Sequence, residues 1–231
     1  MYRAGSTQAA DCLLDSKLFA LTSSVRYVSS YTYEAAYEAR SLTPVAGYAV
    51  GTSVFSALVI PQTLAGKYAG GVLAPNGHVY MVPYNANNIG DFDPATDAFS
   101  VVSISGVISH GSKYAGGVLA PNGHIYMVPD NADSIGDFDP ATGSFSALDI
   151  SGVISHGHKY RLGVLAPNGH IYMVPCNADG IGDFNPATGV FKVIGFSSVI
   201  SHAVKYYGGV LAPNGHIYML PYKEIFHDLR Q

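Results

Sequence analysis

Histidines that recur 46 positions apart are the residues of this chain with the clearest capacity for chemistry. His110, His156 and His202 each end a Val-Ile-Ser-His segment, and Leu64 stands at the equivalent fourth position. Imidazole is a common ligand of divalent transition metals, so three imidazoles around one axis would form a metal site. Because a loop histidine also hydrogen-bonds its own backbone, the sequence favours a structural role. We predict no metal and no cofactor here.

Polar loops and one arginine accompany these histidines in the repeat. The loops carry Asn or Asp, and they share a face with the histidines if successive strands run antiparallel. The third copy alone has Arg161, at a position where the other copies have Ala or Tyr. A guanidinium binds anionic groups with two parallel donors, although drift within a duplicated array explains the same difference. The predicted ligand-binding residues are His110, His156, His202, Arg161, Asn131, Asp133, Asn177 and Asp179.

Three further sets of polar residues recur, and each has a structural explanation. The histidines after the Asn-Gly turns are expected to be half-exposed at strand starts. The aspartates before Pro-Ala-Thr are expected to accept backbone hydrogen bonds in Asx turns rather than to bind Ca²⁺. The lysines before a Tyr are expected at the blade rim as solvated or paired charges. The sets are His78, His124, His170 and His216; Asp93, Asp139 and the equivalent Asn185; and Lys67, Lys113, Lys159 and Lys205.

The sequence predicts no catalytic residues. It contains neither Gly-x-Ser-x-Gly nor His-Glu-x-x-His. Near-identical copies also lack the paired groups of unequal pKa that a catalytic site needs. One set breaks the symmetry, because His158, Arg161 and Cys176 include a base and a nucleophile by residue type. The sequence identifies no third group that would orient the base.

One repeated segment, GGVLAPNGH(V/I)YM, explains this periodicity. It recurs at Gly70–Met81, Gly116–Met127, Leu162–Met173 and Gly208–Met219, a spacing of 46 residues. Each unit holds a Gly-rich apolar run, a Pro-Asn-Gly turn and three further apolar segments between polar turns, which predicts four antiparallel strands. Four strands in a period in the 40s are typical of one β-propeller blade. The predicted blades are 67–112, 113–158 and 159–204.

The two ends of the repeat region predict a composite blade. The last copy stops after its second strand, near Tyr222, and the upstream segment Phe55–Ile60 (FSALVI) nearly duplicates FSALDI of 145–150. Residues 41–66 and 205–222 would then share one sheet and close a four-bladed ring. The alternative is an open arc or a larger ring completed by another chain. The predicted domains are an N-terminal extension (1–40), the propeller (41–222) and a charged C-terminal tail (223–231) in which one helical turn would fit.

The turn between the outer strands resembles that of kelch, NHL and quinoprotein-type propeller repeats, which carry Asp-Pro-x-Thr-Gly. Asp139–Gly143 matches this pattern fully, whereas Asp93–Asp97 ends in Asp and Asn185–Gly189 begins with Asn. Over about residues 41–222 the chain is most similar to GGVLAPNG-repeat propellers, which carry no agreed activity. The chain has no Trp and lacks the Trp-Asp ending of WD40 blades. The resemblance implies a β-propeller and supplies no catalytic residue.

Charge and composition limit the partners and the function. The chain has 16 acidic and 12 Lys or Arg residues, and no cluster of basic residues, which argues against nucleic acid. No apolar run reaches the ~18 residues of a membrane span. Two cysteines without a disulfide framework favour a reducing, intracellular compartment. We predict a non-catalytic binding or scaffold propeller with protein partners, a subunit of a larger assembly; the alternatives are a lectin-like glycan-binding propeller and a small-molecule lyase or hydrolase.

Overall fold

The chain divides into two compact units, residues 1–57 and 58–231. The computed structural model describes residues 65–198, 200, 203–222 and 227–229, all of which lie in the second unit. The predicted N-terminal extension, 1–40, therefore lies outside the described residues. The described elements are all β-strands, and none of the described residues belongs to a helix long and apolar enough to cross a membrane. The predicted all-β class is confirmed.

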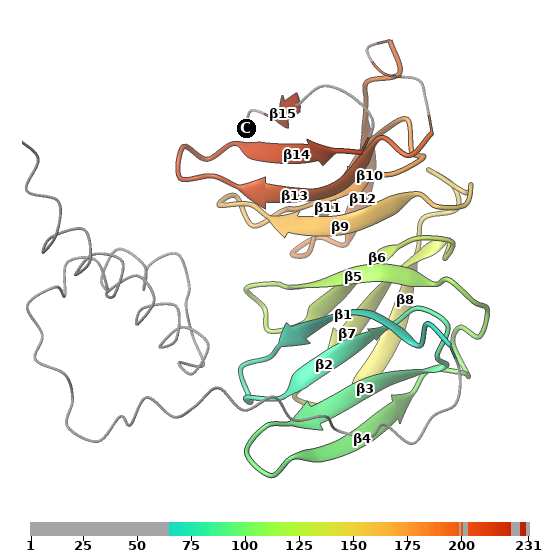
Figure 1. Ribbon diagram of the computed structural model, residues 1–231, viewed down its shortest axis with the longest axis vertical. Coiled ribbons are helices and arrows are strands. Elements are labelled where there is room, and N and C mark those ends of the chain that lie inside the picture. Colours follow the sequence, from blue (N-terminus) through green and yellow to red (C-terminus); the bar gives the residue numbers. More distant parts are fainter. Residues whose placement is uncertain (1–64, 199, 201–202, 223–226, 230–231) are drawn as a thin grey trace, which may run out of the picture. The chain divides into compact units, whose positions relative to one another are not determined.

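Three four-stranded antiparallel sheets follow one another along the chain (Figure 1). In each sheet the strands that are neighbours in sequence are also hydrogen-bonded neighbours, as the repeat predicts for a propeller blade. Blade 1 holds β1 (Tyr68–Leu73), β2 (Val79–Pro83), β3 (Asn88–Asp93) and β4 (Ala98–Ser103); blade 2 holds β5 (Tyr114–Leu119), β6 (Ile125–Pro129), β7 (Ser134–Asp139) and β8 (Ser144–Asp149); blade 3 holds β9 (Tyr160–Leu165), β10 (Ile171–Pro175), β11 (Gly180–Asn185) and β12 (Val190–Gly195).

Two kinds of turn fix the hairpins of each blade. Between β5 and β6, Gly123 has a φ of 84°, a conformation that strains other residues, and its N–H donates to the Ala120 carbonyl at 3.0 Å. Between β7 and β8, the Asp139 carboxylate accepts from the Thr142 hydroxyl (2.7 Å) and the Ala141 N–H (2.9 Å). These bonds, the hydroxyl first, lower the pKa of Asp139. The Asx turn predicted for this aspartate is confirmed.

Successive blades pack face to face through a close approach at a glycine. The inner strands β1, β5 and β9 contact one another in this order. Gly163 of β9 lies against Val118 and Val128 of blade 2, and a Cβ added to it would lie 2.7 and 2.9 Å from their methyl groups. In addition, Tyr126 of blade 2 packs edge-on against Phe184 of blade 3, with ring centroids 4.9 Å apart. The repeated inner-strand glycine therefore sets the spacing between blades.

Three of the four lysines expected at the blade rim are buried between blades, which corrects the sequence prediction for them, whereas Lys67 is partly exposed. We call Lys113, Lys159 and Lys205 the junction lysines; the first two are 0% exposed and the third is 2% exposed. Lys159 Nζ donates to the Ala132 carbonyl at 3.0 Å and lies 2.9 Å from the Asp133 carboxylate, both in the preceding blade. A buried ammonium group needs such partners in place of water. The acceptors belong to another repeat, so a repeat considered alone does not reveal them.

Blade 4 has three described strands, β13 (Tyr206–Leu211), β14 (Ile217–Pro221) and β15 (His227–Leu229). The register pairs Tyr218 with Asp228, so Asp228 takes the register position of the third-strand aspartates in the other blades. The predicted tail thus supplies a strand at His227–Leu229, and not a helical turn there, because this segment pairs with β14. Residues 41–64 lie outside the described residues, so the composite blade and the closed ring stay predictions.

The inner-strand glycine gives a direct test of blade packing. We expect Gly163→Ala to lower the free energy of unfolding by about 1–3 kcal/mol, because the added methyl group would overpack the contact with Val118 and Val128. Gly152→Ala is the matched control, since a Cβ there meets nothing within 4 Å. Urea unfolding followed by circular dichroism measures both variants. Equal stability of the two variants would contradict this account of the junction.

Candidate functional site

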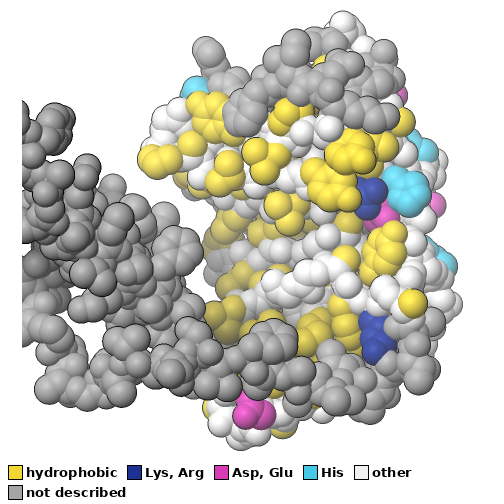
Figure 2. Space-filling model, viewed as in Figure 1, with side chains coloured by type: hydrophobic (Ala, Val, Ile, Leu, Met, Phe, Trp, Pro, Cys, Tyr) yellow, Lys and Arg dark blue, Asp and Glu magenta, His cyan; other side chains and the backbone are white. Residues whose placement is uncertain are grey.

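A pocket opens beside the inner strands, and one position of the repeat lines it four times. This position varies between copies, with Ala in β1 and β5, Arg in β9 and Tyr in β13. Figure 2 looks onto the inner strands and shows hydrophobic side chains gathered there, with basic, acidic and histidine side chains next to them. The pocket has a volume of about 360 Å³ and is lined by Ala69, Tyr84, Ala115, Arg161, Leu162 and Tyr207. The copies of the repeat therefore carry different side chains at the inner-strand position that lines the pocket.

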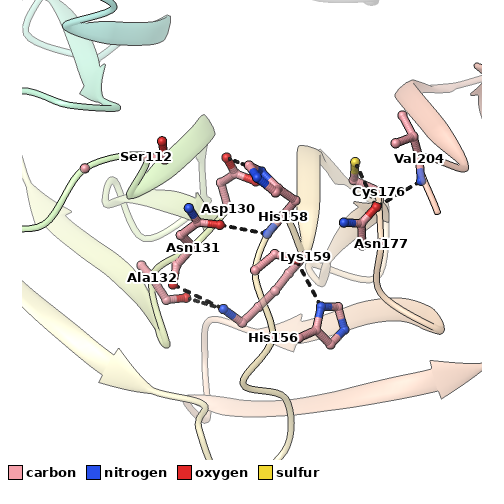
Figure 3. Close-up of polar contacts among 12 residues, drawn as sticks. Ser112, Asp130, Asn131, Ala132, His156, His158, Lys159, Cys176, Asn177 and Val204 are labelled. Carbon is pink, nitrogen blue, oxygen red and sulfur yellow. Dashed lines mark hydrogen bonds and ion pairs between the residues drawn. The ribbon is translucent and has the colours of Figure 1, made fainter.

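Two more variable positions of the repeat lie beside this pocket. In blades 2 and 3 they bring His158 and Asp130 together, with His158 Nδ1 3.1 Å from Asp130 Oδ1 (Figure 3). The Asp130 side chain is fully buried and the His158 side chain is 48% exposed. A shielded carboxylate thus holds and orients an accessible imidazole. The first position comprises Tyr84, Asp130, Cys176 and Tyr222, and the second comprises Gly66, Ser112, His158 and Val204.

Arg161 is the cationic group of the pocket. Its guanidinium carbon lies 5.7 Å from the centre of the Tyr207 ring, and that ring stacks on Tyr222 with centroids 5.3 Å apart. Burial alone would lower the pKa of Arg161, but Cys176, Asp130 and Tyr207 outweigh burial and raise it. The buried Nε of Arg161 has no hydrogen-bond partner in the protein. The fold therefore leaves one donor of Arg161 unpaired, whereas the guanidinium group as a whole interacts with Cys176, Asp130 and Tyr207.

Cys176 is buried, and its Sγ lies 3.8 Å from the side-chain oxygen of Asn177. Among the hydrogen bonds of the described residues, none joins Cys176 to His158. The structure thus supplies the orienting group that the sequence did not identify, Asp130, but it does not pair the thiol with the imidazole. Cys176 interacts instead with Arg161.

The predicted histidine ring is only partly within the described residues. His110 Nδ1 lies 2.9 Å from the carbonyl oxygen of Gly111, and His156 Nδ1 lies 3.1 Å from that of Gly157. These are the local loop contacts that the sequence favoured. His202 lies outside the described residues. The part of the chain that the structure describes contains no group of three or more His, Cys, Asp or Glu side chains placed to hold a metal ion.

The predicted ligand-binding asparagines hold the backbone of the next blade. Asn131 Oδ1 accepts from the His158 N–H at 2.8 Å, and Asn177 Oδ1 accepts from the Val204 N–H at 2.9 Å. Both donors have a left-handed backbone, with φ of 52° and 54°. That conformation is uncommon outside glycine and costs free energy, so the asparagine contact helps to hold it. We call Asn85, Asn131 and Asn177 the junction asparagines, since Asn85 accepts from Ser112 in the same way.

The predicted aspartates contact the junction lysines. Asp133 lies 2.9 Å from Lys159 Nζ, and Asp179 Oδ1 lies 3.3 Å from Lys205 Nζ. At the equivalent place in blade 1 stands a neutral side chain, Asn87, whose Oδ1 accepts from Lys113 at 3.1 Å. Burial lowers the pKa of Lys113 below its usual 10.5. Of the predicted binding residues, Arg161 lines this pocket, whereas His156 and Asp179 line a second pocket of about 390 Å³.

Each of the first three blades also carries a histidine–aspartate pair that sequence reasoning missed. His78, His124 and His170 are part-buried at the strand starts, as predicted. Each Nδ1 lies 2.6–2.7 Å from a third-strand carboxylate 13 residues later. The signal available in the sequence was this constant separation, which an antiparallel pairing of the second and third strands brings onto one face. The partners are Asp91, Asp137 and Asp183.

Comparison with known proteins identifies the fold. No family model matches the chain, and no curated protein matches it by sequence. A streptogramin B lyase structure is similar with a TM-score of 0.57 and 16% identity, over 74% of this chain and 57% of that chain. Virginiamycin B lyase from Staphylococcus aureus has a TM-score of 0.56 and 12% identity, over 69% and 54%. An auxiliary nutrient binding protein from Bacteroides ovatus has a TM-score of 0.51 and 17% identity, over 70% and 38%.

These likenesses concern the fold alone, because the identities are low. The chain spans little more than half the length of the lyases that it matches. The neighbours are β-propeller-type proteins, so the predicted propeller fold is confirmed at that level. The GGVLAPNG-repeat family stays a prediction.

The neutral acceptor of Lys113 predicts a stabilising substitution. Asn87→Asp would supply the carboxylate that Asp133 gives Lys159, and we expect about 0.5–1 kcal/mol of added stability at neutral pH, because the exposed carboxylate is screened by water. The pKa of Lys113 is lowered in the folded state, so the unfolded chain holds its proton more tightly. Wild-type stability should therefore rise with pH just below 10.5, and Asn87→Asp should reduce that rise.

Asp133→Asn is the reciprocal control, and it should destabilise the protein by a similar amount. Unfolding midpoints measured from neutral pH to about pH 10.5 test both variants across the titration range of lysine. If Asn87→Asp does not raise the midpoint, or if Asp133→Asn leaves it unchanged, the carboxylates contribute nothing to the junctions.

Proposed function

We propose that this chain is a non-catalytic binding propeller, whose pocket around Arg161 recognises an anionic group on a partner. The observation that supports this most directly is the place of Arg161, a cationic side chain that lines the pocket among apolar and aromatic residues. A ligand carboxylate would accept from the terminal guanidinium nitrogens of Arg161 in the two-pronged geometry that arginine favours, since Nε itself is buried.

The division of roles between shared and variable positions supports the same proposal. The residues that recur in each copy make contacts inside the fold, as the junction lysines, the junction asparagines and the histidine–aspartate pairs show. The positions that vary include those of Arg161 and Tyr207, which line the pocket, although outer-strand positions such as that of Lys192 vary as well. Variation at the pocket alters the ligand contacts and leaves the shared contacts of the scaffold in place, as a recognition site requires.

The pocket walls indicate the kind of group that accompanies the anion. Ala69, Ala115 and Leu162 are apolar, and Tyr84 and Tyr207 add aromatic surface with a hydroxyl group. We infer a carboxylate next to apolar or aromatic atoms, such as an acidic or C-terminal residue of a protein partner. A glycan with a carboxylate would meet the same donors, and a glycan array would separate these two sources.

A second candidate function, small-molecule lyase chemistry, draws on one observation. His158 is accessible and is oriented by the buried carboxylate of Asp130, an arrangement that suits a general base. The structural likeness to streptogramin B lyase concerns the fold and adds no argument for this chemistry. Turnover of a substrate that is lost in His158→Gln, with ligand affinity kept, would favour the lyase over the binding propeller.

Substitution of Arg161 tests the binding proposal. With benzoate as the probe, we expect saturable binding by calorimetry or NMR, and a loss of at least about tenfold in affinity in Arg161→Ala, because one charge-assisted contact is removed. Lys192→Ala is the control of equal charge change, since the Lys192 side chain is 63% exposed on an outer strand and does not line the pocket. Equal affinity of the two variants, or no binding by the wild type, would contradict the proposal.

A further inference from the structure

Three successive junctions between blades repeat one apolar contact. A pair of apolar side chains from the first two strands of a blade holds the inner-strand glycine of the next. A Cβ built on Gly117 would lie 2.9 Å from a Val82 methyl group and 3.0 Å from a Val72 methyl group, and Gly209 would meet the Val174 methyl at 2.8 Å. The full set of contacts is Val72 and Val82 on Gly117, Val118 and Val128 on Gly163, and Val164 and Val174 on Gly209.

Blade 4 carries the same apolar pair, and no glycine of another blade in the described part of the chain lies against it. Val210 and Leu220 occupy the places of Val118 and Val128, and they are 53% and 48% exposed where their counterparts are 9% and 0% exposed. These are large fractions for apolar side chains in the inner two strands of a blade. The face of β13 and β14 is therefore built like a junction surface and is left open.

Blade 1 carries the complementary surface, also open. Gly71 occupies the place of Gly117 and is exposed. A Cβ built on Gly71 would meet only its own hairpin, a Val79 methyl group at 3.3 Å and the Tyr80 carbonyl at 3.7 Å. Phe92, whose counterpart Phe138 is fully buried, is likewise part-exposed. The two ends of the four-blade succession are thus the two halves of one more junction.

The sequence limits what can occupy the open face of blade 4. The GGVLAPNGH motif occurs four times if the third copy is counted with Leu162, and three of its inner-strand glycines are already held by an apolar pair. Residues 1–64 contain no copy of the motif. Within this chain, Gly71 is therefore the one matching surface left among the described blades.

We propose that the β13–β14 face of one copy docks on the β1–β2 face of a second copy, with Val210 and Leu220 holding Gly71. Each copy offers both surfaces, so two such contacts related by a two-fold axis would join two copies into one eight-bladed ring. The contact surfaces on the two copies are different, and this head-to-tail geometry closes only when the rotation between copies permits it.

This junction between copies would lack the polar part of the internal junctions. By sequence, Lys223 and Ile225 stand where blade 3 has Asn177 and Asp179, so the loop of blade 4 offers neither the junction asparagine nor the acceptor for a lysine. Only the apolar contact remains. We therefore expect an association that reverses on dilution, unlike the covalently connected junctions within the chain.

Oligomeric state tests the proposal with surface substitutions. Light scattering coupled to size exclusion should give twice the 24.3 kDa of one chain for the wild type at high concentration, and one chain for Val210→Lys, Leu220→Lys and Gly71→Val. The first two variants bury a charge in the contact, and the third fills the glycine site. Val190→Lys is the matched control, since Val190 is 58% exposed on the outer strand β12 and should not disturb the dimer.

A mixing experiment then separates head-to-tail docking from other dimers. Val210→Lys and Gly71→Val are each single chains alone, but together they keep one intact junction, because the first retains Gly71 and the second retains Val210. We expect their mixture to form a dimer, and two copies of the same variant not to. A monomeric wild type at all concentrations, dimers that survive all three substitutions, or a mixture that stays monomeric would each overturn the proposal.

Discussion

The buried ammonium group of each junction lysine is the interaction on which the arrangement of blades depends. Its side chain starts on the inner strand of one blade and ends among the loop oxygens of the blade before, so it fixes two sheets at once. An ammonium ion in a place without water is tolerated only if several acceptors converge on it. The loop must therefore keep a defined shape, and the junction asparagines, which bind the residue before each lysine, help to keep it.

Around that fixed polar point, the apolar part of each junction adds close packing. Valine methyl groups reach a glycine on the neighbouring inner strand, and a tyrosine meets a phenylalanine across the same interface. Burial supplies the larger share of the stabilising free energy, whereas the lysine contacts select one relative placement. Blade 4 has the apolar part of a junction without the polar part. It keeps the apolar pair Val210 and Leu220, but its sequence lacks the junction asparagine and the acidic acceptor of a lysine.

Periodicity allowed much of the fold to be predicted from the sequence. The 46-residue spacing predicted four strands per blade, and the turns at Gly123 and Asp139 are as their residue types indicate. The wrong prediction for the lysines has an identifiable cause. The lysines were assigned to a solvated rim because their acceptors lie 26–28 residues earlier, in another repeat. Arg161 was predicted as a binding residue because it differs from its counterparts in the other copies. Asp130 was not predicted as a site residue, because its partner His158 lies in the next blade.

The described contacts between blades join only adjacent blades, and this has a consequence for how such a chain can change in length. Every contact described between blades joins a residue of one blade to a residue of the next blade, and the same contact recurs one unit later. Removal of a whole 46-residue unit would bring together two surfaces that already fit one another, and insertion of a copy would do the same. Recombination between the near-identical units would therefore yield folded chains with a different number of blades, each with a different set of side chains around its axis.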